Sequence, residues 1–205
     1  MGSARNAPGT VTPNPTSEGR NVDGHARPYA VLVKVALVSD THLPRFGRAL
    51  PLALVRGMLD AGVERILHAG DWTTPLAVDL LEAIAPVDGV AGNNDGPDLH
   101  ERFGTARIVD IDGVRIGLTH GHLGPGVTTP DRALHAFDGT PGLAAIVFGH
   151  SHQPLVRLRE DGRWLVNPGS PTDRRREATF SWALLEARAC SIATVELVRY
   201  DDRST

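Results

Sequence analysis

VLVKVALVSDTH, residues 31–42, is the stretch of sequence that decides the fold. Its first eight residues are aliphatic apart from Lys34, which is the pattern of a strand buried on both faces of a parallel sheet. The apolar run stops at Ser39, and two ionisable side chains, Asp40 and His42, follow at once. Because α/β sheets build their sites at the carboxyl ends of strands, this stretch predicts both a fold class and the position of a site.

The residues after this strand alternate between helical and strand patterns. We expect helices over residues 49–61 and 75–84, and strands over residues 64–68 and 87–91. Gly62 closes the first helix, and Thr74-Pro75 places an N-cap before a proline at the first position of the second. The β-α-β-α-β order predicts parallel strands whose carboxyl ends share one edge of a sheet.

Beyond Asp95, hairpin patterns replace this alternation. Asp112-Gly113 and Asp161-Gly162 each lie between two strand-like runs, which is a strong signal for a tight hairpin turn. The expected strands are residues 106–111, 114–119, 144–148, 155–159, 163–166, 180–187 and 192–200. One more helix is expected over residues 131–137, capped by Thr129-Pro130. Mixed strands with few helices predict two packed sheets with the helices outside.

The first 29 residues differ in composition from the rest of the chain. They are rich in proline and glycine and hold almost no large apolar side chains. We therefore expect a disordered tail over residues 1–29 and one folded domain over residues 30–205. The chain shows no apolar segment typical of a signal peptide or a membrane span, so a cytoplasmic protein is expected.

The balance of charged residues argues against nucleic acid and anionic membranes as general partners. The 205 residues include 21 Lys and Arg against 24 Asp and Glu, a net charge of −3 with His neutral. A general binder of nucleic acid or of an anionic membrane needs a basic surplus, so neither function is expected. One cysteine, Cys190, excludes an internal disulfide and a cysteine-cluster zinc site. Nine histidines are then the feature of the composition that calls for an explanation.

Five of the expected strands end in residues that can bind a divalent metal ion. These segments are residues 39–42, 70–71, 92–95, 120–122 and 149–152. Imidazole and carboxylate ligands suit Zn, Mn, Fe or Ni. Residues i and i+2 of an extended segment face the same side, so Asp40 and His42 are expected to share an ion, as are His150 and His152. The donors exceed the four that one tetrahedral ion needs, which predicts two ions bridged by a carboxylate.

Each motif alone also has an ordinary structural interpretation. An isolated Asp-x-His occurs by chance or as a cap, Gly-Asp is a common turn, and Gly-Asn-Asn-Asp is typical of an Asx-rich turn. The metal site is favoured because all five motifs follow predicted strands, where an α/β fold gathers its functional groups.

In their order along the chain, these motifs resemble those of the calcineurin-like metallophosphoesterase superfamily. They read Asp-x-His, Gly-Asp, Gly-Asn-x-Asp, Thr-His-Gly-His, Gly-His-Ser-His and, at residues 167–170, Asn-Pro-Gly-Ser. The chain is most similar to the compact bacterial and archaeal phosphodiesterase branch, which also includes the retromer scaffold subunit. The similarity covers residues 35–198 and implies a four-layer α/β/β/α sandwich of two mixed sheets flanked by helices.

The resemblance also implies a set of metal ligands. Asp40, His42 and His152 would hold the first ion, and Asp71 would bridge both ions. The second ion would be held by Asn93, His120 and His150. His120 is preferred to His122 because the ligand of the family directly follows the strand.

One position departs from the pattern of many family members. They have a histidine where this chain has Asn94, and that histidine assists the leaving group. Asparagine can donate a hydrogen bond to a phosphate oxygen but cannot supply a proton. Asn94 and His122 are therefore the expected substrate-facing residues, with His122, the metal ions or water as alternative proton sources. The compact branch often lacks this histidine as well, so hydrolysis is still expected.

The resemblance implies a metal-dependent phosphoric ester hydrolase, with a phosphodiester as the expected substrate. Two divalent ions would lower the pKa of a bridging water toward about 7, and the resulting hydroxide would attack phosphorus in line with the leaving oxygen. Mn²⁺ is the expected metal, with Ni²⁺, Fe²⁺ and Zn²⁺ as alternatives. The expected partner is a small phosphoester. The motifs leave its identity and the oligomeric state open.

Two other functions compete with the hydrolase. A metal-binding protein-interaction scaffold with weak or no catalysis is the alternative, but the scaffold branch lacks the histidine that is His42 here. A centre of the metallo-β-lactamase type requires His-x-His-x-Asp-His, whereas Leu123-Gly124-Pro125 follow His122 in this chain. That reading is excluded.

Several other conspicuous residues receive a structural interpretation. Trp72 is expected to pack in the core rather than to stack on a substrate base. The arginines at 174–176 are typical of a solvated surface, although their place after the Asn-Pro-Gly-Ser turn allows them to approach a phosphate. Cys190 is expected to be inert. The remaining histidines, expected to be structural or exposed, are His25, His68, His100 and His135.

Overall fold

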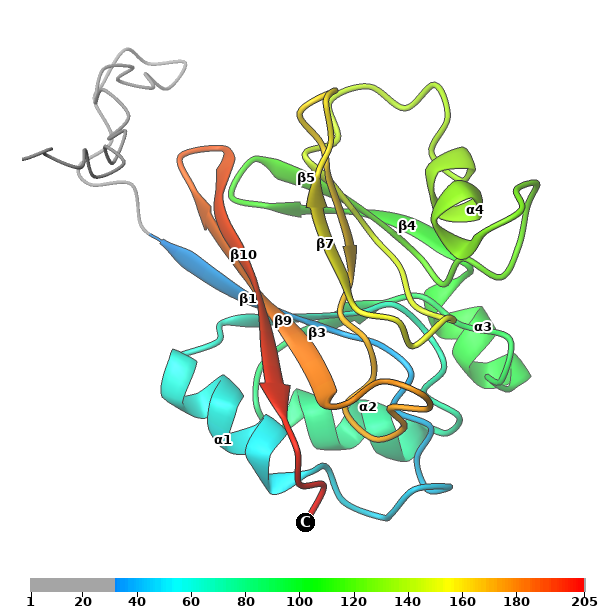
Figure 1. The fold of residues 1–205 in the computed structure, drawn as a ribbon, viewed down its shortest axis with the longest axis vertical. Coiled ribbons are helices and arrows are strands. Elements are labelled where there is room, and N and C mark those ends of the chain that lie inside the picture. Colours follow the sequence, from blue (N-terminus) through cyan, green and yellow to red (C-terminus); the bar gives the residue numbers. More distant parts are fainter. Residues whose placement is uncertain (1–31, 205) are drawn as a thin grey trace, which may run out of the picture. The chain divides into compact units, whose positions relative to one another are not determined.

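The computed structural model describes residues 32–204, which form two five-stranded sheets flanked by helices (Figure 1). The predicted tail, residues 1–29, lies outside the described residues. No helix in the described part of the chain combines the length and the apolar character that crossing a membrane requires. The two mixed sheets with external helices confirm the predicted fold class.

The first sheet has the strand order β10-β9-β1-β2-β3. Its parallel strands are β1 (Val33–Val38), β2 (Arg65–His68) and β3 (Val87–Gly89), joined by α1 (Leu52–Ala61) and α2 (Pro75–Glu82). The antiparallel strands β9 (Phe180–Arg188) and β10 (Ser191–Tyr200) complete it. The predicted β-α-β-α-β unit is therefore confirmed, with the carboxyl ends of β1, β2 and β3 at one edge.

The second sheet has the strand order β4-β5-β6-β8-β7. Its strands are β4 (Ala106–Ile111), β5 (Val114–Thr119), β6 (Ala145–Val147), β7 (Leu155–Leu158) and β8 (Trp164–Asn167). Strands β5, β6 and β8 run parallel, whereas β4 and β7 pair antiparallel with β5 and β8. The Asp-Gly turns join β4 to β5 and β7 to β8, so both predicted hairpins are confirmed.

Strand β1 is apolar on both faces because it lies between two cores. Val35 and Leu37 point to the second sheet, where they join a cluster that includes Ile116 of β5. Ala36 and Val38 point the other way, into a cluster with buried residues of α1 and α2. A fully buried aliphatic side chain contributes about 1.5–3 kcal/mol, so a strand of this kind anchors both layers. A third cluster packs α4 (Thr129–His135) on the outer face of the second sheet.

The helices differ from the sequence-based expectation at several points: α1 begins at Leu52 rather than at residue 49, and α2 ends at Glu82 rather than at residue 84. Helix α3 (Pro97–Phe103) was not predicted, because only Leu99 and Phe103 of its seven residues are buried and give no clear periodicity. The proline at its first position and a glycine just past its end are the local signals that mark it. Helix α4 begins two residues earlier than expected, and its N-cap is Thr128, which forms a capping box with Asp131.

Candidate metal centre

The motif residues lie in loops that follow the carboxyl ends of parallel strands in both sheets. Asp40 and His42 follow β1, and Asp71 follows β2. These two loops are hydrogen-bonded to each other, since the amide of Asp40 donates to the carbonyl of Gly70 at 2.9 Å and that of His42 to the carbonyl of Asp71 at 3.0 Å. The other motif residues follow β3, β5 and β6: Asn93, Asn94, His120, His122, His150 and His152.

The expectation that the paired motif residues sit in extended segments is wrong. Asp40 and His42 have φ angles of 56° and 47°, and His150 and His152 have φ angles of 67° and 58°. Non-glycine residues rarely adopt this left-handed conformation, and such strain gathers at functional sites. This left-handed backbone directs the side chains of the two pairs differently. Asp40 and His42 meet in one cluster, whereas His150 and His152 enter different groups of side chains.

The first cluster consists of Asp40, His42 and His152, all buried, with potential ligand atoms within 4.8 Å of one another. The Nε2 atoms of His42 and His152 are 3.2 Å apart, and His152 Nε2 lies 3.3 Å from Asp40 Oδ1. Two imidazole nitrogens at this separation repel each other unless a proton or a metal ion lies between them. The cluster therefore has the donor set and spacing of a divalent-cation site.

The second cluster consists of Asp40, Asp71 and His120, which are also buried and also within 4.8 Å of one another. Asp71 Oδ2 lies 3.3 Å from His120 Nε2 and 3.7 Å from His42 Nε2. The Asp71 carboxylate thus lies between a histidine of each cluster. Asp40 belongs to both clusters as well, a sharing that the sequence motifs do not predict.

Asn93 and His150 lie at the exposed side of the second cluster. Asn93 Oδ1 and His150 Nδ1 are 2.9 Å apart, and the ring of His150 lies 5.2 Å from the ring of His120. The main chain of His150 also donates to Asp40 Oδ2 at 3.1 Å. The structure therefore brings all seven predicted ligand residues to one place.

The ring orientation of two histidines is set by backbone carbonyls. His120 Nδ1 lies 2.7 Å from the carbonyl oxygen of Ala69, and His152 Nδ1 lies 2.6 Å from that of Asp173. A carbonyl oxygen only accepts, so each Nδ1 carries the hydrogen. Each Nε2 then presents its lone pair to the cluster. This is the arrangement by which proteins orient metal-binding histidines.

Electrostatics favour positive charge between these imidazoles and carboxylates. Burial alone would raise the pKa of Asp40 and Asp71, but the proximity of His152 and His120 outweighs it and lowers both pKa values. Burial likewise opposes protonation of His120 and His152, but Asp71 and Asp40 raise the pKa of each. The cluster thus favours a cation at these positions, and a divalent ion supplies that charge without a proton.

Unsatisfied atoms support the same fit. Among the described residues, Asp40 Oδ1 and His120 Nε2 are buried and make no hydrogen bond of acceptable geometry. The other oxygen of Asp40 accepts from Ser39 Oγ at 2.7 Å and from the amide of His150. Leaving buried polar atoms unpaired is costly, so two such atoms in one cluster indicate a missing partner. The residues present fit a divalent cation.

The two predicted substrate-facing residues lie beside the clusters in different ways. Asn94 donates from its backbone amide to Asp71 Oδ1 at 2.9 Å and from Nδ2 to Asp71 Oδ2 at 2.6 Å. Asn94 is therefore an exposed residue whose side-chain amide contacts the Asp71 carboxylate. His122 lies with its ring 5.3 Å from that of His120, and burial together with His120 and His150 lowers its pKa to about 4.

Asp95, which is not among the expected ligands, holds the ligand loops together through hydrogen bonds. Its Oδ2 accepts from the amides of Asp71 at 2.9 Å and Gly92 at 2.7 Å, and its Oδ1 accepts from the amide of Thr73 at 2.6 Å. It thus ties the loop after β2 to the loop after β3. A side chain at Gly92 would collide with the Asp71 carboxylate, so only glycine allows this close approach. Asp95 ends the Gly-Asn-Asn-Asp motif, which was the available signal.

Replacing Asp95 with asparagine is expected to weaken Mn²⁺ binding about 10–100-fold. Both oxygens of Asp95 accept hydrogen bonds from backbone N–H groups. In either orientation of the asparagine amide, its NH₂ group therefore faces at least one of these donors and cannot accept from it. Titration calorimetry on metal-free protein measures the change, with Glu101→Gln, an exposed neutralisation on α3, as the matched control. Equal affinity in Asp95→Asn and the control would show that the loop does not depend on this carboxylate.

The conspicuous residues that were not expected to bind metal lie in the core, in supporting turns or at the surface. Trp72 is fully buried, and His68 is buried beneath it, so both pack rather than face the site. Asn167 donates to the carbonyl of Gly149 at 2.9 Å, and Ser170 donates to the carbonyl of Asp40 at 2.7 Å, so the Asn-Pro-Gly-Ser turn supports the ligand loops. Cys190 is exposed in the β9–β10 turn. His25 lies outside the described residues.

Comparison with known proteins agrees with this geometry. Residues 33–189 match the calcineurin-like phosphoesterase superfamily domain. A probable metallophosphoesterase of Methanothermobacter thermautotrophicus is 39% identical over 140 residues, covering 67% of this chain and 77% of that protein. Another from Methanocaldococcus jannaschii is 32% identical over 164 residues, covering 73% of this chain and 79% of that protein.

The fold is shared with a solved structure of a more distant protein. A single-mutant Vps29 from Entamoeba histolytica aligns with a TM-score of 0.63 at 21% identity, covering 82% of this chain and 99% of that chain. This likeness concerns the arrangement of the two sheets and their helices. The chain belongs to the calcineurin-like phosphoesterase superfamily, and it shares its fold with Vps29.

Proposed function

We propose that this chain is a phosphodiesterase that depends on a dinuclear metal centre. The observation that carries the proposal is the pair of buried clusters, Asp40/His42/His152 and Asp40/Asp71/His120, which share a carboxylate and contain unsatisfied ligand atoms. A structural metal site needs one closed set of four ligands, whereas this site offers two adjoining sets with an exposed side at Asn93.

The proposed ligand assignment follows the two clusters. Asp40, His42 and His152 would hold the first ion, and His120 with the Asn93–His150 pair would hold the second. Asp71 would bridge the ions, since its Oδ2 lies between His42 and His120. Two bound divalent cations would supply an acidified water and neutralise charge that develops on the phosphoryl oxygens.

The remaining groups of the site would bind and orient the substrate. Asn94 is exposed, and its Nδ2 can donate to a phosphoryl oxygen when it leaves the Asp71 carboxylate. His122 Nδ1 is buried and makes no hydrogen bond to any described residue, so a turn of the His122 ring would be needed to bring it to the leaving-group oxygen. These two residues lie on the loops after β3 and β5, next to the second cluster, so we place the leaving group on that side.

Metal loading and diester hydrolysis test the proposal together. Protein stripped with a chelator and reloaded with Mn²⁺ is expected to retain two ions per chain by elemental analysis. Its unfolding free energy should rise by about 2.7 kcal/mol for a site filled at a hundredfold excess over Kd. The loaded protein is expected to release nitrophenolate from bis(4-nitrophenyl) phosphate, and the stripped protein is not.

Three other results would each have a distinct meaning. One ion per chain would contradict the dinuclear arrangement. Hydrolysis of 4-nitrophenyl phosphate at a higher kcat/KM than the diester would replace the phosphodiesterase with a phosphomonoesterase. Two bound ions with no hydrolysis in Mn²⁺, Ni²⁺, Fe²⁺ or Zn²⁺ would favour the alternative, a metal-binding protein-interaction scaffold.

A further inference from the structure

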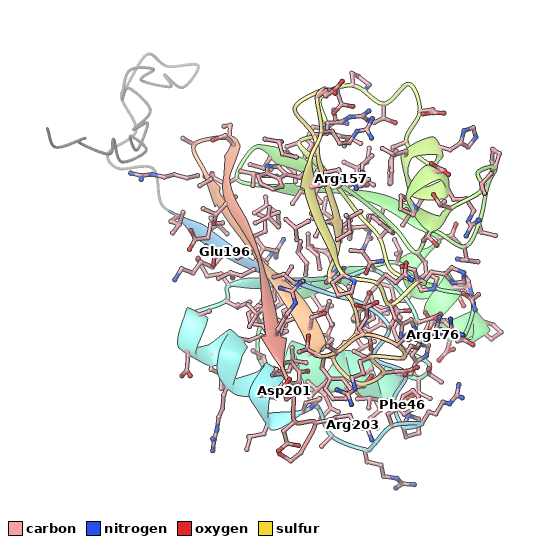
Figure 2. All side chains as sticks on the ribbon, viewed as in Figure 1. Phe46, Arg157, Arg176, Glu196, Asp201 and Arg203 are labelled. Carbon is pink, nitrogen blue, oxygen red and sulfur yellow. The ribbon has the colours of Figure 1, made fainter. Side chains whose placement is uncertain are left out.

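Phe46 connects the candidate metal centre to two arginines. Its ring lies edge-on to the ring of His42, with centroids 6.2 Å apart and an interplanar angle of 76°. The guanidinium carbons of Arg45 and Arg203 lie over the Phe46 ring, at 5.2 and 5.5 Å from its centroid. Figure 2 shows Phe46 and Arg203 near each other at the bottom of the view. One aromatic ring thus separates His42 from each guanidinium.

Contacts with the ligand loops hold Arg203 in place. Its Nη1 donates to the carbonyl oxygen of Thr172 at 2.9 Å. Thr172 Oγ1 in turn donates to the carbonyl of Thr41, the residue between Asp40 and His42, at 2.7 Å. The next residue, Ser204, accepts from the amide of Leu52 at the start of α1 at 2.8 Å. The C-terminal segment is therefore attached both to the loop that carries His42 and to α1.

The two guanidinium groups have no acidic partner within residues 32–204. No ion pair is formed there by Arg45 or Arg203. The nearby carboxylate of Asp173 lies 3.9 Å from Arg175, and that of Asp202 accepts from Ser204. Stacking on an aromatic face leaves the N–H groups at the edge of a guanidinium able to meet phosphate oxygens in a bidentate arrangement. In Arg203 one Nη1 hydrogen is used on the carbonyl of Thr172, and the other N–H groups are left for an anion. Arg45 and Arg203 thus form an unneutralised arginine pair beside the first cluster.

The loop next to the second cluster has the opposite character. Residues 121–128 contain no Lys, Arg, Asp or Glu, and they expose Leu123 by 53% and Val127 by 94%. Arg132 bonds this loop to α4 through the carbonyls of Gly121 at 2.9 Å and Gly126 at 3.2 Å. Arg132 brings a positive charge to this side too, but its Nε, Nη1 and Nη2 already donate to Gly121, Gly126 and Thr129. The charged arm of a substrate is therefore expected to extend toward the arginine pair, and an uncharged arm toward the exposed Leu123 and Val127.

We propose that Arg45 and Arg203 form an anion subsite that binds a second phosphate of the substrate. The preferred substrate is then a phosphodiester that carries a further phosphate group on the arm extending past His42. This inference rests on the proposed phosphodiesterase function for its scissile bond. The arginine pair is expected to bind an anion without metal, because its links to the candidate ligands are indirect, through the Phe46 ring and, for Arg203, through Thr172.

The test compares dinucleotides with and without a terminal phosphate. The probes are thymidylyl-thymidine and the same compound phosphorylated at its 5′ end or at its 3′ end. With Mn²⁺-loaded protein, one of the two phosphorylated forms is expected to have a KM about tenfold lower than that of thymidylyl-thymidine. A tenfold change is what one additional charge-assisted contact contributes to binding. Arg45→Gln combined with Arg203→Gln should reduce this ratio to about one. Arg56→Gln, an exposed arginine on α1, is the matched control and should keep the ratio.

A readout without turnover separates this inference from the proposed function. In metal-free protein labelled with ¹⁵N, the side-chain Nε signals of Arg45 and Arg203 are expected to shift with the phosphorylated dinucleotide and not with the plain one. Phe46→Leu keeps both charges but removes the ring that stacks them, so it should weaken these shifts. If these shifts occur in the metal-free protein but the Mn²⁺-loaded protein hydrolyses none of the dinucleotides, the anion subsite is supported and the phosphodiesterase function is overturned.

The opposite results would overturn the subsite. Hydrolysis with the same KM for all three dinucleotides would keep the phosphodiesterase and remove the anion subsite. A preference for terminal phosphate that survives in the double arginine variant would place the second phosphate elsewhere. In either case the stacking on Phe46 would serve only to fasten the C-terminal segment to the loop that holds His42.

Discussion

Replacement of Asp71 by asparagine is expected to lower kcat for phosphodiester hydrolysis by about a thousandfold. Asp71 Oδ2 lies 3.7 Å from His42 Nε2 and 3.3 Å from His120 Nε2, so in the proposed centre this carboxylate would bridge the two ions. Loss of several kcal/mol of charge stabilisation corresponds to roughly this factor, since each 1.36 kcal/mol is tenfold in rate. Asparagine keeps the shape of the side chain but removes its negative charge.

Steady-state kinetics on bis(4-nitrophenyl) phosphate, with elemental analysis of the same samples, measures this effect. Asp60→Asn is the matched control, because Asp60 is exposed on α1 and belongs to no cluster. Circular dichroism checks that the variant has folded. We expect the Asp71 variant to retain fewer than two ions per chain. A folded Asp71→Asn protein with near-full rate and two ions would contradict the dinuclear centre.

The largest loss of stability is expected from Trp72→Ala. Trp72 is fully buried, its ring stacks on His68 at 3.5 Å and on Phe103 at 5.0 Å, and its Nε1 donates to the carbonyl of Val90 at 2.8 Å. Removing a buried aromatic side chain costs about 3–5 kcal/mol, through lost burial and the cavity that remains. For a domain of this size, the melting temperature should fall by on the order of 10 °C.

Thermal unfolding of metal-free protein measures this loss without any contribution from bound ions. Trp72→Phe is the matched variant, since it keeps an aromatic ring and loses mainly the hydrogen bond to Val90, at a cost of about 1 kcal/mol. The experiment also separates the two interpretations of Trp72. A residue that stacks on a substrate base would change KM when truncated and leave the melting temperature near that of the wild type.

The strands were predictable because each carries its own periodic signal. Strand β1 is apolar on both faces since one face packs on the second sheet and the other on helices, and both hairpins are marked by Asp-Gly. Helix α3 escaped prediction because seven residues with two buried side chains produce almost no periodicity. The cap of α4 was misplaced by one residue because Thr128 and Thr129 are adjacent and only the geometry shows which one bonds Asp131.

The sequence by itself determined which residue types gather at the centre, because motif order and strand ends are local properties of the chain. The tertiary structure decided how they meet: that Asp40 joins both clusters, that His150 and His152 part, and that Asp95 ties two loops together. It also brought Arg203 to Phe46, although these residues lie far apart in the chain. Such contacts depend on left-handed backbone turns and on packing between distant segments, which no local pattern of side chains encodes.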